Sequence, residues 1–151
     1  MQLADLKNSP PNFSSAKIAL IHDHQILVYE RDNFPHIPYP GFIDLPGGGR
    51  ENNETAFACI IREVNEEFGI LLSPANISYV SLYPSGQRKG KLSVFFAGSI
   101  SPEMISAINF GNEGHSWRMM PMRDFLSNPN VVPAYAARTK TYLKTNSQRK
   151  P

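Results

Sequence analysis

Three glutamates within five residues are the part of this sequence whose residue types and spacing point most directly to chemistry. Glu63, Glu66 and Glu67 are spaced i, i+3 and i+4, so a helix would place all three carboxylates on one side. Like charges at this spacing repel one another by roughly 0.2–0.5 kcal/mol per pair. Because Mg²⁺ and Mn²⁺ prefer oxygen ligands of this kind, the spacing predicts a site for a divalent cation.

The surrounding residues predict the helix that such a site needs. Apolar side chains recur at i, i+3, i+4, i+7 and i+11 on a different arc from the acids, at Phe57, Ile60, Ile61, Val64 and Phe68. We expect the helix to run from Asn53, as its N-cap, to Phe68, with Gly69 as the residue that ends it. Ala56 and Cys59 fall on the acidic side, where their small size would leave room for an ion.

A run of glycines, Gly47 to Gly49, precedes this helix. Consecutive glycines let the backbone approach a ligand closely, and a glycine-rich loop before a helix N-terminus presents N–H groups to anions. Taken alone, such a run is more often a flexible turn. Its position directly before the acidic helix favours a ligand-binding loop.

The stretch from Gly48 to Ile70 resembles the sequence box of the Nudix (MutT-like) hydrolases, G-x5-E-x7-R-E-U-x-E-E-x-G-U, in which U is aliphatic. Every specified position is matched. The resemblance implies a mixed α/β (α+β) fold, with a mixed sheet in a sandwich between helices. It also implies a hydrolase that depends on Mg²⁺ or Mn²⁺ and cleaves the pyrophosphate bond of a nucleoside diphosphate linked to a further moiety, X.

The resemblance also assigns roles to residues by matching position, and the catalytic set is Glu54, Arg62, Glu63, Glu66 and Glu67. The last three would hold the metal, Arg62 would orient Glu63 through a charged hydrogen bond, and Glu54 would be a supporting partner. The Gly47 carbonyl is expected as a further metal ligand, and Gly47, Gly48 and Gly49 as contacts to the substrate. Which carboxylate acts as the general base is left open, because acids around one metal titrate as a group.

Three candidates lie outside the box. Some members of the family use a further glutamate on a later loop, and Glu113 is the best match for that catalytic and metal-binding role; its alternative is a solvated loop carboxylate. Arg31, directly after a predicted strand, could contact a phosphate or simply be solvated. Arg88 lies in a basic turn with Lys89 and Lys91, which is either a solubilising edge or a phosphate contact.

Hydrophobic periodicity and turn signals predict the remaining elements. We expect strands at 17–22, 26–30, 42–45, 77–83, 92–100 and 116–119, a proline-rich loop at 34–41, and helices at 122–126 and 134–143. This gives a loose N-terminal lead over 1–14, a single domain over 15–144 and a frayed tail over 145–151.

Composition narrows the class of protein. The chain has 151 residues, 41% hydrophobic content and a net charge of +2, which fit one globular domain and argue against a nucleic-acid groove. One cysteine excludes an internal disulfide, and no apolar run approaches the ~20 residues of a membrane span. We therefore expect a cytoplasmic protein without membrane or nucleic-acid partners, and a homodimer is one assembly that the resemblance allows.

The identity of X is open. We slightly favour nucleoside triphosphates, oxidised ones included, over ADP-ribose or another sugar nucleotide, because the chain is compact and only Pro84 matches the proline that ADP-ribose hydrolases carry after the box. A third alternative is a Nudix module that binds nucleotide or RNA without turnover. That alternative predicts the loss of a box glutamate, and none is lost.

Overall fold

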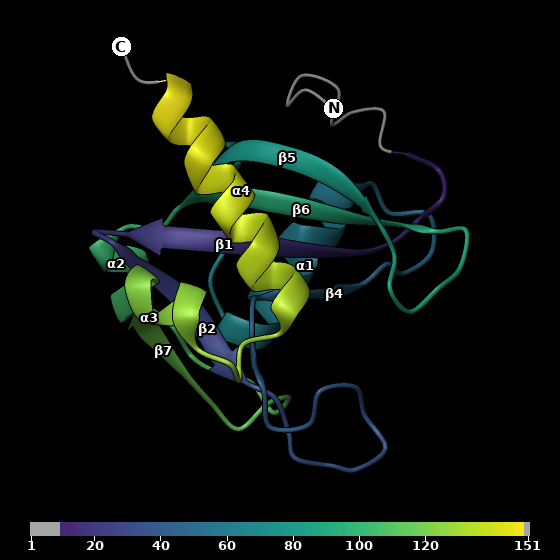
Figure 1. Cartoon of the computed structure of the whole chain (residues 1–151), viewed down its shortest axis with the longest axis horizontal. Helices are drawn as coiled ribbons and strands as arrows, with labels where there is room; N and C mark the ends of the chain where they lie inside the picture. Colours follow the sequence, from purple (N-terminus) through teal and green to yellow (C-terminus); the bar gives the residue numbers. More distant parts are fainter. Residues whose placement is uncertain (1–9, 150–151) are drawn as a thin grey trace.

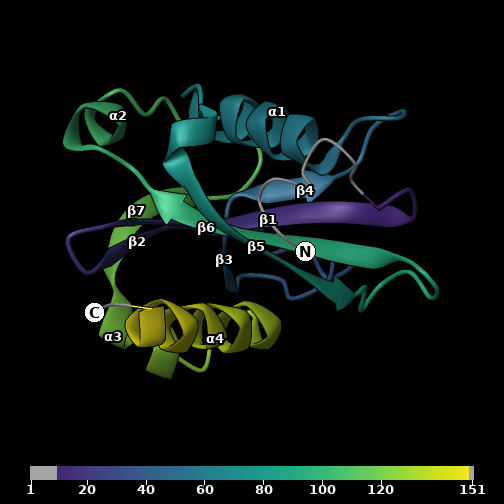
Figure 2. The same ribbon diagram turned by 90° about the horizontal axis from the view of Figure 1, so that it is seen from above.

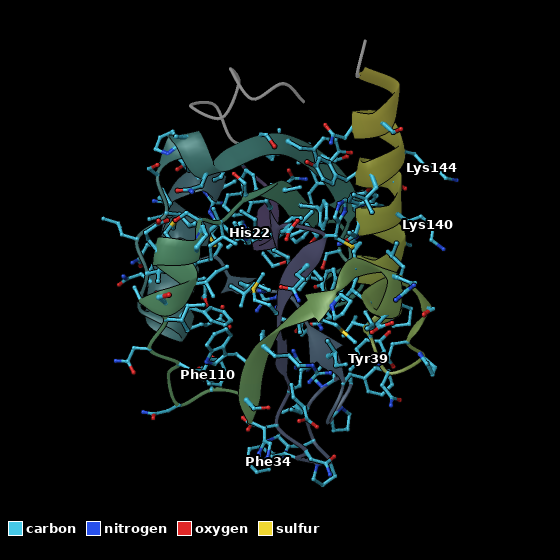
Figure 3. All side chains as sticks on the ribbon, turned by 90° about the vertical axis from the view of Figure 1, so that its left-hand side faces the viewer. His22, Phe34, Tyr39, Phe110, Lys140 and Lys144 are labelled. Atoms are coloured by element: carbon cyan, nitrogen blue, oxygen red, sulfur yellow. The ribbon has the colours of Figure 1, made fainter. Side chains whose placement is uncertain are left out.

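The computed structural model describes residues 10–149, which form one mixed sheet with helices on both faces (Figures 1 and 2). The strands are β1 (Phe13–His22), β2 (Gln25–Glu30), β3 (Ile43–Asp44), β4 (Gly47–Gly49), β5 (Ile77–Pro84), β6 (Leu92–Ser99) and β7 (Ser116–Pro121). The helices are α1 (Ala56–Phe68), α2 (Pro102–Ser106), α3 (Met122–Ser127) and α4 (Pro133–Arg149), with a short 3-10 turn at Pro74–Asn76. The mixed α/β class predicted above is confirmed.

The sheet has the order β3-β2-β1-β6-β5, with β4 also paired to β1 and β7 to β2. Among the strand pairs within residues 10–149, only β1–β6 is parallel; an isolated parallel bridge joins Ile43 to Val131. Helices α1 and α2 cover one face and α3 and α4 the other (Figure 2). Each face has its own apolar cluster of buried side chains, because the strands are covered on both sides.

Strands β1 and β2 begin as a hairpin and then separate. Asp23 and His24 both have positive φ, 47° and 62°, as a two-residue hairpin turn requires. The two strands pair only at Ile21–Ile26 and His22–Gln25. Beyond these pairs the segment 43–49 enters between them, with β4 paired to β1 and β3 paired to β2. This insertion brings the glycine run into the sheet.

Helix α1 ends as predicted but begins later. Gly69 is left-handed, with φ 67°, and its N–H donates to the Asn65 carbonyl. The predicted N-cap at Asn53 is wrong: Thr55 has the extended backbone of an N-cap, and its Oγ1 accepts from the Ala58 N–H at 3.1 Å. The reason is local, because the chain still turns at Asn52, where φ is 52°.

Three further elements differ from the expectations. The glycine run is strand β4, because its backbone pairs with β1 at Ser15, Ala16 and Lys17. Helix α2 was not expected. Helix α4 continues to Arg149 where a frayed end was predicted from 145, since no glycine or proline interrupts the sequence before Pro151. Of the predicted N-terminal lead, residues 1–9 lie outside the described part of the chain, and Phe13 and Ser14 already belong to β1.

Candidate active site

A single guanidinium organises the acidic face of α1. The Arg62 side chain holds Glu54 with two hydrogen bonds, from Nε to Oε2 at 2.7 Å and from Nη2 to Oε1 at 2.9 Å. This paired arrangement is the strongest that arginine and carboxylate can form. The hydrogen bond to Arg62 lowers the pKa of Glu54, and the same bond raises the pKa of Arg62. Glu54 is thus a permanent anchor for Arg62.

The same guanidinium reaches two of the three predicted metal ligands. Its Nη1 donates to Glu63 Oε1 at 3.0 Å and to Glu66 Oε2 at 3.1 Å, and its Nη2 also donates to the Gly49 carbonyl at 2.8 Å. Arg62 therefore joins α1 to the end of β4. With Glu51 at 3.5 Å, one positive charge faces four carboxylates, so the local charge stays negative.

Glu67 is held separately. Only 6% of the residue is exposed, and its Oε1 accepts a hydrogen bond from the Gly47 N–H at 2.8 Å. Burial raises the pKa of Glu67 to about 8, although the Lys17 charge and the Gly47 N–H oppose that rise. The Glu67 carboxylate is thus packed against the backbone of β4, because the glycine strand lies directly over this part of α1.

The close approach of β4 requires glycine at two positions. A Cβ at Gly47 would lie 2.1 Å from the Ala16 carbonyl oxygen, and a Cβ at Gly48 would lie 2.6 Å from the carboxyl carbon of Glu63. On the helix side, Ala56 and Cys59 are fully buried. Their small size makes room for β4 and not for an ion, which corrects the expectation above.

Cys59 is a packing residue. Its Sγ lies 3.8 Å from the Gly48 carbonyl and 3.7 Å from the Gly49 carbonyl. Burial raises the pKa of the thiol to about 12. A thiol with that pKa stays protonated at neutral pH and is not a nucleophile.

Glu113 lies on an exposed loop that is tied to both α1 and β2. The Gly111 N–H donates to the Glu67 carbonyl at 2.8 Å, and the His115 N–H donates to the carbonyl of Glu30, the last residue of β2, at 2.8 Å. Burial raises the pKa of Glu63, and the Glu113 carboxylate is among the negative charges that raise it further. The loop therefore brings Glu113 to the same side of the molecule as the box glutamates.

The box carboxylates suit a hard divalent cation by their chemistry. Across residues 10–149, no three His, Cys, Asp or Glu side chains already form a metal cage, because Arg62 and the Gly47 N–H each hold oxygens of these glutamates. Within the same residues, the only fully buried side-chain oxygen or nitrogen without a partner is the Thr139 hydroxyl. Among the described residues, the second oxygens of Glu63 and Glu67 accept no hydrogen bond from the protein, and the donor set fits the predicted ion.

The two predicted arginines differ in their surroundings. Arg31 donates from Nη1 to Asp44 at 2.8 Å and from Nε to the Pro38 carbonyl at 2.9 Å, and it lines an open pocket of about 230 Å³ with Glu30, Asn33 and His115. Arg88 is exposed in the turn between β5 and β6, where its backbone N–H donates to Ser85 Oγ at 3.0 Å. Among the described residues, the Arg88 side chain has no recorded contact with the box glutamates.

A buried polar cluster beside the site was not predicted. Lys17 and Asp44 form an ion pair at 3.1 Å with side-chain exposures of 9% and 1%. Burial alone would lower the pKa of Lys17, but the Asp44 carboxylate, together with Tyr29, Tyr135 and Glu67, outweighs burial and raises that pKa. The sequence held a signal for this pair, since each charge interrupts an apolar strand segment, and such charges must find partners.

Comparison with known proteins identifies the family. The model of the NUDIX domain matches residues 12–142, which is most of the chain, so the protein belongs to the Nudix hydrolase family of pyrophosphohydrolases. Members of this family typically use divalent metals. No curated protein matched the sequence.

Solved structures share the fold at low sequence identity. The MutT protein from Methanosarcina mazei Go1 has 19% identity and a TM-score of 0.72, over 93% of this chain and 97% of that one. The E. coli ORF135 protein has 18% identity and a TM-score of 0.65, over 89% and 91%. A bifunctional NMN adenylyltransferase/ADP ribose pyrophosphatase from Francisella tularensis, complexed with AMP and a Mn ion, has 22% identity and a TM-score of 0.63; the match covers 94% of this chain and 46% of that one.

None of the helices within the described residues is long and apolar enough to cross a membrane. The match to the NUDIX domain confirms the family and the enzyme class that the sequence predicted. The roles of the individual site residues, the cytoplasmic location and the homodimer stay predictions.

Proposed function

We propose that the protein hydrolyses a pyrophosphate bond in a nucleoside diphosphate derivative with Mg²⁺ or Mn²⁺, and that nucleoside triphosphates, oxidised ones included, are its favoured substrates. The observation that carries this proposal is the glutamate array on α1, which is complete; Arg62 holds Glu63 and Glu66, and the Gly47 N–H holds Glu67. A pyrophosphate is densely anionic, so the surplus of carboxylates makes sense only with cations between protein and substrate.

Glu63, Glu66 and Glu67 would hold the metal, with the Gly47 carbonyl and Glu113 as further ligands. When bound, the ion neutralises phosphate charge and lowers the pKa of a bound water. Arg62 fixes one oxygen of Glu63 and leaves the other free. Glu54 keeps Arg62 in that position, so the array is oriented before any substrate arrives.

In the reaction, the water oxygen attacks phosphorus while the bridging oxygen leaves with its electron pair on the other phosphate. A carboxylate takes the proton of the water. We assign this proton to the group formed by Glu63, Glu66, Glu67 and Glu113 and not to one residue, because acids around one metal titrate as a group.

Arg31 would bind a phosphate of the substrate. Among the described residues its Nη2 has no recorded partner, and the guanidinium borders the open pocket next to the loop of Glu113. Gly48 and Gly49 would contact the substrate through their backbone, and Arg88 would reach only a substrate that extends to the turn between β5 and β6.

A second candidate substrate is ADP-ribose or another sugar nucleotide. The shared fold with the Francisella tularensis protein, whose description includes an ADP ribose pyrophosphatase, keeps this candidate open. Pro84, the last residue of β5, matches the proline noted above. Neither observation selects this candidate over the nucleoside triphosphates.

The test is release of phosphate or pyrophosphate with Mg²⁺ and with Mn²⁺, over standard and oxidised nucleoside triphosphates, ADP-ribose, sugar nucleotides and dinucleoside polyphosphates. The proposal expects metal-dependent turnover of one class, strongest for triphosphates and lost in Glu67→Gln. Turnover of ADP-ribose alone would select the second candidate. Nucleotide binding without any turnover would contradict both.

A further inference from the structure

The buried polar cluster beside the active site converges on one carboxylate. Asp44 Oδ2 accepts hydrogen bonds from Lys17 Nζ at 3.1 Å, from the Tyr29 hydroxyl at 3.1 Å and from Arg31 Nη1 at 2.8 Å. Its Oδ1 accepts the backbone N–H of Leu45 at 2.7 Å. Asp44 is only 1% exposed, so its four donors come entirely from the protein.

Lys17 holds the same segment from the other side. Its ammonium also donates to the Leu45 carbonyl at 3.0 Å. The Lys17–Asp44 pair therefore binds both polar groups of the Leu45 backbone, the N–H through Asp44 and the carbonyl through Lys17. Because the N–H and the carbonyl of Leu45 are both hydrogen-bonded, this segment cannot rotate without breaking a buried hydrogen bond.

The Leu45 segment leads directly to the backbone amide that binds Glu67. Two residues after Leu45, the Gly47 N–H donates to Glu67 Oε1 at 2.8 Å. Lys17 also lies opposite Gly47 in the β1–β4 register, and the neighbouring Ile18 N–H donates to the Pro46 carbonyl at 3.0 Å. The direction of the Gly47 N–H is thus set by the residues around Lys17.

From this geometry we infer that Lys17, paired with Asp44, is a positioning residue of the active site: it fixes the Gly47 amide, which in turn fixes the Glu67 carboxylate. The inference rests on the proposed role of Glu67 as a metal ligand. Among the described residues, Lys17 makes no hydrogen bond or ion pair with the box glutamates, although its buried charge also acts electrostatically on the Glu67 carboxylate. It acts only through Glu67.

The position of the cluster in the fold explains why polar groups are used here. It lies where β1 and β2 separate and where the segment 43–49 enters the sheet. The backbone of Leu45 therefore lacks a regular ladder partner for its N–H and carbonyl, and buried backbone groups must be paired. An apolar residue at 17 would leave both Asp44 and the Leu45 carbonyl short of a partner.

The test measures Mn²⁺ binding by electron paramagnetic resonance without substrate, in wild type, Lys17→Met, Glu67→Gln and the double variant. We expect Lys17→Met to weaken Mn²⁺ binding at least about fivefold. In the Glu67→Gln background the same change should have less than about a twofold effect, because a residue that acts only through Glu67 adds nothing once that carboxylate is gone. A purely structural role would instead weaken binding equally in both backgrounds and would overturn the inference.

Two controls separate positioning from loss of stability. Ile26→Ala removes buried apolar contacts on the α4 face and should lower the melting temperature without changing Mn²⁺ affinity. Thr139→Val removes another buried polar group, one without a partner, and should change neither. If Lys17→Met does not fold, Lys17→Arg, which keeps the charge but moves the donors, is measured in the same cycle with the same expected non-additivity.

The kinetic readout follows on whichever substrate the wild type turns over. Lys17→Met should lower kcat at least about fivefold with KM within about twofold, whereas Mn²⁺ binding and kcat both within twofold of wild type would overturn the inference. Wild-type protein that binds no Mn²⁺ would instead contradict the proposed function. The two failures are therefore distinguishable.

Discussion

Two neighbouring carboxylate clusters in this protein have opposite charge balances. Around Arg62, one cation faces Glu54, Glu63 and Glu66 within 3.1 Å. Around Asp44, one carboxylate faces two cations, Lys17 and Arg31, within 3.1 Å. The first cluster is partly open to solvent, whereas Asp44 and Lys17 of the second are buried.

The difference shows how charge separates a site that needs a ligand from one that does not. The Asp44 carboxylate receives all its hydrogen bonds from within the protein, so it needs no cation from outside. The Arg62 cluster, with Glu67 beside it, keeps surplus negative charge and, among the described residues, carboxylate oxygens without a hydrogen bond from the protein, so it needs a cation from outside. Both clusters consist of short contacts between acidic and basic side chains, and they differ in the sign of their net charge.

The largest effect is expected for a substitution in the Asp44 cluster. Asp44→Asn leaves Lys17 and Arg31 without their common anion, and the loss of one partner from a buried pair costs about 3–5 kcal/mol. Urea unfolding at neutral pH measures this free energy. Asp124→Asn, an exposed aspartate in the first turn of α3, should cost less than about 1 kcal/mol, and equal losses in both variants would remove the contrast between the clusters.

The second-largest effect is expected for Glu67, which lies beside the Arg62 cluster. Glu67→Gln should lower kcat/KM by at least about a hundredfold, or about 2.7 kcal/mol, because the amide keeps the hydrogen bond from Gly47 but loses the charge. The fold should survive for the same reason. Glu103→Gln, on exposed α2, is the control, and a Glu67→Gln variant within tenfold of wild type would sink the assigned role.

The pH dependence of stability sharpens the comparison further. The pKa of Glu67 is raised from 4.5 to about 8 by burial, so between these values the folded state binds more protons than the unfolded state. Stability of the metal-free protein should therefore fall as pH rises from about 4.5 to about 8. Urea unfolding with EDTA checks this, and Glu67→Gln should flatten the slope; a slope unchanged in the variant would assign it to other groups. Addition of Mg²⁺ should restore stability most at the upper end of this range.

The residues of the acidic helix were predictable because each feature is local in sequence. The spacing of the glutamates, the apolar arc of α1 and the end at Gly69 all follow from helix geometry. The Thr55 cap and helix α2 were also local, since Ser101 followed by Pro102 is a helix-start signal, and its Oγ does accept from the Met104 N–H. The sequence carried the signals for both features, and our predictions missed them.

The rest depends on pairings between distant residues. Nothing near Gly47 in the sequence indicates that its N–H binds Glu67, or that β4 pairs with β1. The Lys17–Asp44 pair likewise joins residues 27 positions apart. The sequence indicates only that each charge needs a partner, and the fold chooses which.

The smallest effect is expected for Glu113, the candidate ligand outside α1. Glu113→Gln should lower kcat/KM by less than about tenfold, or 1.4 kcal/mol, because this exposed loop carboxylate adds to a site that three other glutamates already define. The loop is held by Gly111 and Gly114, so the substitution should leave stability unchanged. Steady-state kinetics at several Mg²⁺ concentrations would show whether the loss is recovered at high metal, as expected for a supplementary ligand. Kinetics identical to wild type would limit the cluster to the residues of α1, and the further ligand or base would have to lie elsewhere.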